Sequence, residues 1–122
     1  AKTCSGSIVF CMGISKTYEV AKRIGHPVAR EFYADREYDN SGSIVFRRQV
    51  SRPVAQDLAQ KCVRACREGV VRTIEGDDIE IEFESICFHS DTPGALEIGK
   101  AIRSGLNEAG ITVAPAPSVL GL

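Results

Sequence analysis

Apolar positions in the first quarter of the chain predict a strand, a helix and a second strand. Residues 7–12 form a short, almost continuous apolar run, which is typical of a strand covered on both faces in a parallel sheet. Ser15 is suited to cap a helix that continues to about Ile24, where Gly25 favours a left-handed stop. The second strand is predicted over residues 28–33.

A long loop and an amphipathic helix are predicted next. Residues 34–52 contain a turn-forming cluster at 39–42 and one small strand at 44–46. A helix opens near Pro53 and closes at Gly69. Its inward face is predicted to carry Val54, Leu58, Cys62 and Cys66, and its outward face Asp57, Lys61, Arg64 and Arg67.

Alternating residues after this helix predict a β-hairpin. Its arms are residues 70–75 and 79–84, and the turn lies at 76–78. Glutamates alternate with apolar residues along the second arm, as expected for a sheet with one face in the core and one in water. The acidic row is therefore interpreted as a solvated face without chemistry.

The last third of the chain returns to strand and helix in turn. A short strand is predicted over 86–88, a helix over 93–109 that ends at Gly110, a last strand over 111–114 and an irregular tail over 115–122. The inward face of this helix is predicted to consist of Ala95, Gly99, Ile102 and Leu106. Alternation of strands and helices favours an α/β fold with a largely parallel sheet.

Composition narrows the class of protein. The chain has 122 residues, of which 43% are hydrophobic and 25% charged, which predicts one globular domain over residues 1–122. The formal net charge is -1 and there is no basic stripe, so nucleic acid is not an expected partner. There is no apolar run of about 18 residues and no signal-peptide pattern, so we expect no membrane association and a cytoplasmic location.

Cysteine usage favours buried, reduced thiols over disulfides or a metal site. There are five cysteines, an odd number: Cys4, Cys11, Cys62, Cys66 and Cys87. Cys62 and Cys66 are spaced to share a metal, but no second Cys or His pair completes the site. A thiol-dependent or metal protein would require Cys62, Cys66 and Cys87 to converge.

The segment after the predicted strand 86–88 is the first candidate site. His89 follows that strand directly, and a histidine in this place can transfer protons near neutral pH, bind a ligand or fill a hydrogen-bonding niche. Asp91 or Thr92 can instead cap the next helix with Pro93 at its first position. Capping and a catalytic or ligand-binding role both stay open for these two residues.

A second candidate site ends the predicted strand 28–33. Residues 30–36 carry carboxylates and guanidinium groups that are able to hold a small carboxylate or a polyphosphate. Surface ion pairs explain the same residues equally well.

Three segments resemble motifs of the LamB/YcsF family, in order and in spacing. Residues 32–38 read Phe-Tyr-Ala-Asp-Arg-Glu-Tyr, residues 42–47 read Gly-Ser-Ile-Val-Phe-Arg, and residues 87–95 read Cys-Phe-His-Ser-Asp-Thr-Pro-Gly-Ala. The family's patterns read like Val-Phe-Ala-Asp-Arg-x-Tyr, Gly-Thr-Leu-Val-Pro-Arg and Cys-Val-His-Gly-Asp-Thr-Pro-Gly-Ala. The resemblance extends from about Ser7 to Val113.

The resemblance implies a fold and an activity. The fold is a deformed β/α barrel of the seven-stranded type, as in the glycoside hydrolase/deacetylase superfamily, of which this chain would form the C-terminal half. The activity is that of an ATP-dependent 5-oxoprolinase, which opens the lactam 5-oxoproline to glutamate with ATP as co-substrate. Partner subunits of the 5-oxoprolinase are implied, and the need for a metal is left open.

Site residues are carried over from the resemblance position by position. His89 and Asp91 are the predicted catalytic residues, His89 for proton transfer and Asp91 to orient it or a water. The predicted substrate- and ATP-binding residues are Asp35, Arg36, Arg47 and Thr92. No residue is assigned to a metal.

Departures from the family's pattern keep a second hypothesis open. The earlier motifs Gly-x-His-Ala-Gly-Asp-Pro, Ala-His-Pro and Lys-Pro-His-Gly-Ala-Leu-Tyr do not occur, and about half the family's usual chain is absent. Ser90 replaces the usual glycine and Phe46 a proline, and His26 is interpreted as a loop residue. The alternative is a truncated, non-catalytic binding or assembly module of the same fold, with homo-oligomers as a possible state.

Overall fold

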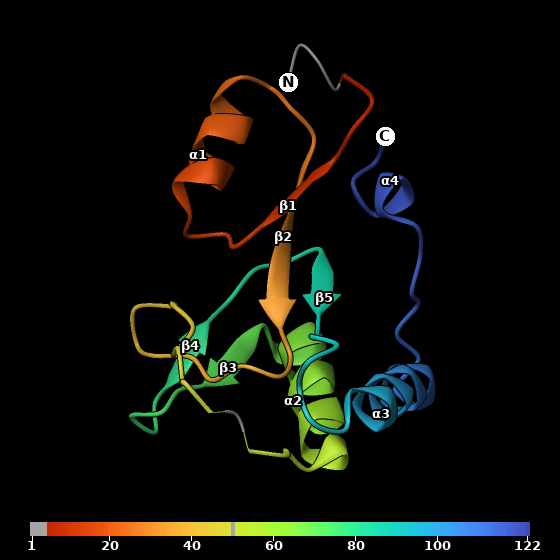
Figure 1. Ribbon diagram of the computed structural model, residues 1–122. Coiled ribbons are helices and arrows are strands. Elements are labelled where there is room, and N and C mark those ends of the chain that lie inside the picture. Colours follow the sequence, from red (N-terminus) through yellow and green to blue (C-terminus); the bar gives the residue numbers. More distant parts are fainter. Residues whose placement is uncertain (1–4, 50) are drawn as a thin grey trace. The chain divides into compact units, whose positions relative to one another are not determined.

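The computed structural model describes residues 5–49 and 51–122 (Figure 1). The elements are β1 (Val9–Cys11), α1 (Lys16–Arg23), β2 (Val28–Tyr33), α2 (Ala55–Glu68), β3 (Val70–Arg72), β4 (Asp78–Glu80), β5 (Ser85–Cys87), α3 (Ala95–Glu108) and α4 (Ala116–Val119). Strands β1, β2 and β5 form one sheet in that order, and β3 and β4 form a second. The predicted α/β class is confirmed.

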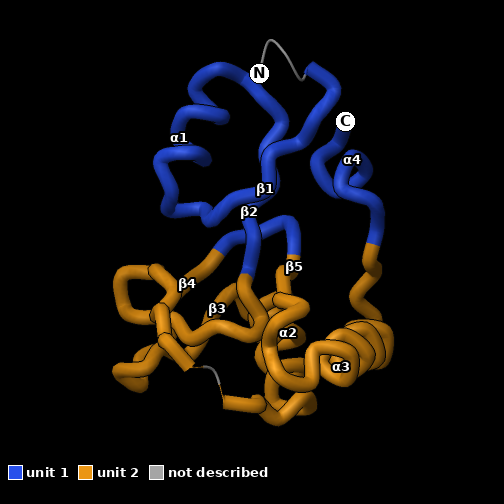
Figure 2. The backbone as a smooth tube through the Cα atoms, in the orientation of Figure 1, with its two compact units in different colours: residues 1–32, 82–85, 114–122 blue, residues 33–81, 86–113 orange. Residues whose placement is uncertain are grey.

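The chain divides into two compact units (Figure 2). Unit 1 comprises residues 1–32, 82–85 and 114–122, and unit 2 comprises residues 33–81 and 86–113. Each unit has buried apolar residues of its own. The prediction of a single domain over 1–122 stays a prediction.

In unit 1, the first strand and helix form as the sequence predicts. Strands β1 and β2 pair in parallel, with Val9 opposite Val28. The Ser15 side chain accepts a hydrogen bond from the Tyr18 backbone N–H at 3.1 Å and caps the start of α1. After the end of this helix, Gly25 adopts a left-handed backbone conformation with φ +69°. A side chain with a Cβ is strained at that φ, which explains why glycine stands there.

The core of unit 1 is small. Ala21, Val28, Ala29 and Phe32 are buried, and the rings of Phe32 and Phe83 stack with centroids 5.1 Å apart. Burial of this kind of apolar surface contributes roughly 25 cal/mol per Å² removed from water. Phe32, with no exposed surface, is the largest single contributor among these residues.

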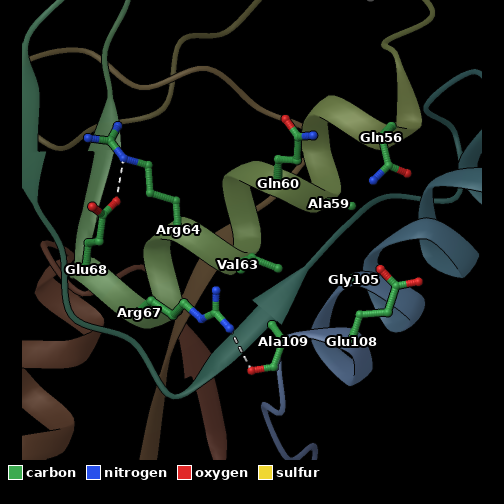
Figure 3. A pocket seen from close by; sticks show the side chains of 10 residues that line it. All are labelled: Gln56, Ala59, Gln60, Val63, Arg64, Arg67, Glu68, Gly105, Glu108 and Ala109. Carbon is green, nitrogen blue, oxygen red and sulfur yellow. Dashed lines mark hydrogen bonds and ion pairs between the residues drawn. The ribbon is translucent and has the colours of Figure 1, made fainter.

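In unit 2, α2 and α3 pack closely because small residues face each other. Ala59, Cys62 and Ala65 form the buried side of α2, and a Cβ added to Gly105 of α3 would lie 3.4 Å from the Ala59 Cβ. Arg67 Nη2 also donates to the Ala109 carbonyl at 3.0 Å, so the end of α2 is tied to the end of α3. Both helices line the pocket drawn in Figure 3.

The inward face predicted for α2 is partly wrong. Val54 precedes the helix and is 62% exposed, and Cys66 is also exposed. Cys62 is buried as predicted, but the other buried residues of α2 are Ala59 and Ala65, each one position away from the predicted Leu58 and Cys66. Lys61 was predicted to face water, but its side chain is held by backbone carbonyls.

Three further expectations for local structure differ from the observed elements. The small strand at 44–46 is reduced to one antiparallel bridge between Tyr38 and Ile44. Residues 111–114 form no strand, since among the described residues no neighbouring strand supplies their hydrogen bonds, and Ile111 N–H donates to the Leu106 carbonyl instead. The tail contains the short helix α4.

The predicted hairpin is confirmed, with a longer connection. Strands β3 and β4 pair in antiparallel register, Val71 opposite Ile79, and Val71 is buried. The acidic row that begins in β4 is not uniformly solvated. The Glu84 side chain is 22% exposed and forms an ion pair with Arg30, whereas the Glu82 side chain is 82% exposed. No described helix combines the length and the apolar character needed to cross a membrane.

Candidate functional site

Two predicted site segments meet in unit 2. Asp35 and Arg36 follow the end of β2, and His89 and Thr92 follow the end of β5. The Ala34 N–H donates to the Cys87 carbonyl at 2.9 Å, which joins the two strand ends. We call Asp35, Arg36, His89 and Thr92 the Asp35 cluster.

The carboxylate of Asp35 is the centre of this cluster. Its side chain is fully buried and accepts from the His89 backbone N–H at 2.8 Å and from Thr92 Oγ1 at 2.6 Å, both on Oδ2. Burial alone would raise the pKa of Asp35, but the hydrogen bonds from Thr92 and His89 outweigh it and lower that pKa. Asp35 is therefore an anion at neutral pH.

The ring of His89 is oriented by the same carboxylate. His89 Nδ1 lies 2.8 Å from Asp35 Oδ1, and an ionised carboxylate only accepts hydrogen bonds, so the proton belongs on Nδ1. The Tyr33 ring stacks on the imidazole with centroids 5.8 Å apart. Because the side chain is 33% exposed, Nε2 of this tautomer is the nitrogen suited to accept a proton from a ligand or a water.

Thr92 and Arg36 complete the cluster. Arg36 Nη1 donates to Thr92 Oγ1 at 3.0 Å and lies 3.5 Å from Asp35 Oδ2, with the arginine side chain 20% exposed. Thr92 does not cap α3, whose N-cap is Gly94 without a side-chain bond. The threonine hydroxyl instead links the guanidinium to the buried carboxylate.

Asp91 lies at the edge of this cluster. Its side chain is 86% exposed, and Oδ1 is 4.0 Å from Arg36 Nη2. The contact that orients His89 is made by Asp35, because the buried carboxylate reaches both the ring and the backbone of His89, and the predicted role of Asp91 in orienting a water stays a prediction. Asp91 makes no capping contact with α3 either.

Arg47 contacts Glu37, which is not a member of the Asp35 cluster. Its Nε donates to Glu37 Oε2 at 2.8 Å, and the two side chains form an exposed ion pair. In the structure Arg36 thus contacts Asp35 and Thr92, and a role for Arg47 in ligand binding stays a prediction.

Sequence reasoning missed Lys61. Its Nζ donates to the carbonyls of Ala34 at 3.2 Å and of Arg36 at 2.6 Å, on either side of Asp35. Desolvation by burial lowers the pKa of Lys61 from 10.5 to about 8. The available signal was the helical spacing, because Lys61 stands between Leu58 and Ala65 on the apolar side of α2.

The described cysteines do not converge. Cys62 is buried, which raises its thiol pKa to about 12, Cys11 and Cys87 are half-buried, and Cys66 is exposed. The expectation of a buried thiol is therefore wrong for Cys66, and Cys4 lies outside the described residues. Across residues 5–49 and 51–122, no three His, Cys, Asp or Glu side chains gather as a metal site requires.

The pocket between α2 and α3 is separate from the Asp35 cluster. It has a volume of ≈ 600 Å³, and its lining, as far as the structure describes the chain, contains none of the predicted site residues. Figure 3 shows polar side chains such as Gln56, Gln60 and Glu108 around it.

Comparison with known proteins decides the family. The family model described as "LamB/YcsF family" matches residues 1–121. The chain belongs to the LamB/YcsF family. The resemblance seen in the three sequence motifs is confirmed.

Relatives of this LamB/YcsF chain carry a common name, that of the 5-oxoprolinase A subunit. The chain is 57% identical over 106 residues to a protein of this name from Pseudomonas putida, in a match that covers 87% of this chain and 42% of that protein. It is 38% identical over 113 residues to a protein of the same name from Pyrococcus furiosus, in a match that covers 88% of this chain and 43% of that protein. The chain therefore spans less than half the length of these relatives.

A solved structure confirms the fold. The crystal structure of a lactam utilization protein from Thermus thermophilus matches with a TM-score of 0.81 at 24% identity, over 92% of this chain and 45% of that chain. The LamB/YcsF fold is a deformed β/α barrel, and the present chain corresponds to part of it.

Proposed function

We propose that this chain works as part of a 5-oxoprolinase A subunit, in the ATP-dependent hydrolysis of 5-oxoproline to glutamate. The observation that supports a chemical role is the buried Asp35 carboxylate that fixes the ring of a partly exposed histidine, His89. The names of the P. putida and P. furiosus relatives supply the substrate.

In this proposal, His89 Nε2 moves the proton. The five-membered lactam is a stable amide, and phosphoryl transfer from ATP to its oxygen makes the carbonyl carbon electrophilic. A water that attacks this carbon loses a proton to Nε2, and the lactam nitrogen takes up a proton when the C–N bond breaks. The acyl phosphate left by this cleavage is hydrolysed by a second water to glutamate and inorganic phosphate. Asp35 stabilises the imidazolium that forms between these steps, as a buried carboxylate does for a catalytic histidine in other hydrolases.

Arg36 is the residue we assign to the anionic end of the reactants. Its planar guanidinium is suited to a carboxylate or a phosphate, and it is held beside His89 through Thr92. Asp91 and Arg47 keep their predicted roles in catalysis and in substrate or ATP binding as part of this proposal. Partner subunits follow from the word "subunit" in the relatives' names, and we place the assembly in the cytoplasm.

The test is a comparison of the two histidines of this chain. 5-Oxoproline-dependent ATP hydrolysis and glutamate release are measured with the partner subunits added, for the unmodified chain, His89→Gln and His26→Gln. His26 lies in the turn between α1 and β2 in unit 1, so it is a matched control. We expect His89→Gln to lose about 10²–10⁴-fold in rate, the usual contribution of general acid–base catalysis, and His26→Gln to keep the rate.

Two outcomes contradict the proposal. Equal rates for His89→Gln and the unmodified chain remove His89 from the chemistry. If the chain binds the partner subunits but gives no turnover, the function becomes that of a non-catalytic binding or assembly module. The specific observation that keeps this second candidate is that the chain spans only 42% of its P. putida relative.

A further inference from the structure

We propose that Lys61 is a positioning residue of the Asp35 cluster, which fixes the backbone on both sides of Asp35 and thereby aims the carboxylate at His89. The geometric part of this inference stands on unit 2 alone, and only its effect on turnover rests on the proposed function. Lys61 has no counterpart among the residues carried over from the family motifs.

The contacts of the Lys61 ammonium group form a clamp. Nζ donates to the Arg36 carbonyl at 2.6 Å and to the Ala34 carbonyl at 3.2 Å, so one cation bridges the residues before and after Asp35. The Ala34 N–H is fixed in turn on the Cys87 carbonyl at 2.9 Å. The backbone at Asp35 is therefore held from α2 and from the end of β5 together.

The clamp matters because Asp35 has little freedom to compensate for a shift. Its side chain is fully buried, and its two oxygens contact His89 and Thr92 at distances of 2.6–2.8 Å. A displacement of the 34–36 turn moves both oxygens at once. Loss of the contact to Nδ1 would release the His89 ring from its tautomer and orientation.

The choice of lysine is not explained by helix packing alone. An ammonium group here is desolvated, which lowers the pKa of Lys61 to about 8, whereas an apolar side chain of the same length would avoid that penalty. The Tyr38 ring, 5.5 Å from Nζ, and the carboxylates of Asp35 and Glu37 offset part of it. The two hydrogen bonds to backbone carbonyls are the contacts that an apolar side chain at this position could not make.

A merely structural lysine would anchor α2 to the 34–36 turn and stabilise the fold without affecting the imidazole. The two roles are therefore distinguished in the imidazole itself. The chain has two histidines, so one His26→Gln variant is enough to assign the ¹⁵N resonances of both imidazole rings. These resonances report the tautomer of each ring directly.

The experiment compares Lys61→Met with Lys100→Met. Both replace a lysine on a helix of unit 2, but Lys100 is exposed on α3. In Lys61→Met we expect the ¹⁵N shifts of His89 to move from the Nδ1–H tautomer toward a mixture of both, while His26 does not change. Lys100→Met is expected to leave both histidines unchanged. In the assay with partner subunits, kcat of Lys61→Met is expected to fall about 10²-fold, the usual cost of a misplacement of about 1 Å.

Lys61→Arg serves as the conservative variant. It keeps a cationic donor on α2, so it is expected to restore the Nδ1–H tautomer of His89, and it keeps the test open if Lys61→Met does not fold. Unchanged His89 shifts in a folded Lys61→Met protein would overturn the inference and leave Lys61 a structural anchor. A Lys61→Arg protein that folds but shows the mixed tautomer would also overturn it.

The inference and the proposed function fail in different ways. If His89→Gln keeps full turnover but Lys61→Met shifts the His89 resonances, the positioning role of Lys61 is supported and proton transfer by His89 is contradicted. If His89→Gln loses turnover but Lys61→Met leaves the His89 resonances and kcat unchanged, proton transfer by His89 is supported and the positioning role of Lys61 is contradicted.

Discussion

Two charged clusters, one in each compact unit, show how similar side chains serve different ends. In unit 1, Glu84 accepts from the Arg30 backbone N–H at 2.7 Å, from its Nε at 3.1 Å and from its Nη2 at 2.6 Å. In unit 2, Asp35 accepts from the ring and backbone of His89 and from Thr92. In both, a partly or fully buried carboxylate receives several donors.

The difference lies in the partner of each carboxylate. An arginine stays charged at any ordinary pH, and Arg30 donates from Nε and Nη2 to Glu84 while its Nη1 donates to Glu82, so these ion pairs fix structure. Burial would raise the pKa of Glu84, but the hydrogen bonds from Arg30 lower it overall. A histidine has two ring nitrogens, and Asp35 occupies only Nδ1, so Nε2 is left for proton transfer.

Asp35→Asn is expected to have the largest effect on this comparison. The amide oxygen is drawn to the His89 N–H and the Thr92 hydroxyl, which places the amide nitrogen against Nδ1 and forces the proton onto Nε2. A wrong tautomer of this kind costs about 10⁴ in kcat in a serine protease, and we expect a loss of the same order. Imidazole ¹⁵N shifts and the assay with partner subunits check it.

Asp91→Asn is the matched control for Asp35→Asn. Asp91 is 86% exposed and its nearest cationic partner, Arg36, is 4.0 Å away, so the tautomer of His89 is expected to stay as it is. An Asp35→Asn protein that retains the Nδ1–H tautomer would contradict the role given to the buried carboxylate.

Glu84→Gln is expected to affect stability and not the imidazole. It removes a charge that accepts from three donors of Arg30. We expect the free energy of unfolding to fall by about 1.5–3 kcal/mol in total, the contribution of one hydrogen bond to a charged group. Glu82→Gln, at an exposed and single contact, is expected to cost under about 1 kcal/mol. Urea unfolding measures both losses. A shifted His89 resonance in Glu84→Gln would contradict the purely structural role given to the Arg30–Glu84 pair.

Thr92→Val is expected to have the smallest effect and a defined pH dependence. It removes one hydrogen bond to the Asp35 carboxylate, so the folded-state pKa of Asp35 rises. Because a lowered carboxyl pKa stabilises the fold above the unfolded value of 3.8 and this stability is lost as the pH falls through the folded value, the variant loses stability mainly at neutral pH.

The size of the Thr92→Val effect is about 1–2 kcal/mol at pH 7. It should shrink as the pH falls below 3.8 and through the lower folded-state pKa of Asp35, below which the carboxyl group is protonated in both states. Thr92→Ser keeps the hydroxyl and is expected to restore the unmodified profile. Unfolding curves between acid and neutral pH decide it, and a difference that stays constant with pH would exclude the carboxylate as its cause.

Local sequence patterns predicted most of the elements. Ser15, Gly25 and Gly69 act through hydrogen bonds or backbone angles within a few residues, so the limits of α1 and the end of α2 could be inferred from short segments. The strand 28–33 was predicted with its observed bounds. Residues 111–114 were apolar enough for a strand, but a strand also needs a neighbour, which the local pattern does not report.

The sequence determined the candidate site as a set of residues and the family through motifs that keep their order. Only the tertiary structure decided how these residues are paired. His89 and Asp35 are 54 positions apart, so no local pattern indicates that Asp35 rather than Asp91 holds the ring. Lys61 was assigned to water because a lysine is usually solvated, and only the tertiary structure brings the Ala34 and Arg36 carbonyls to its ammonium group.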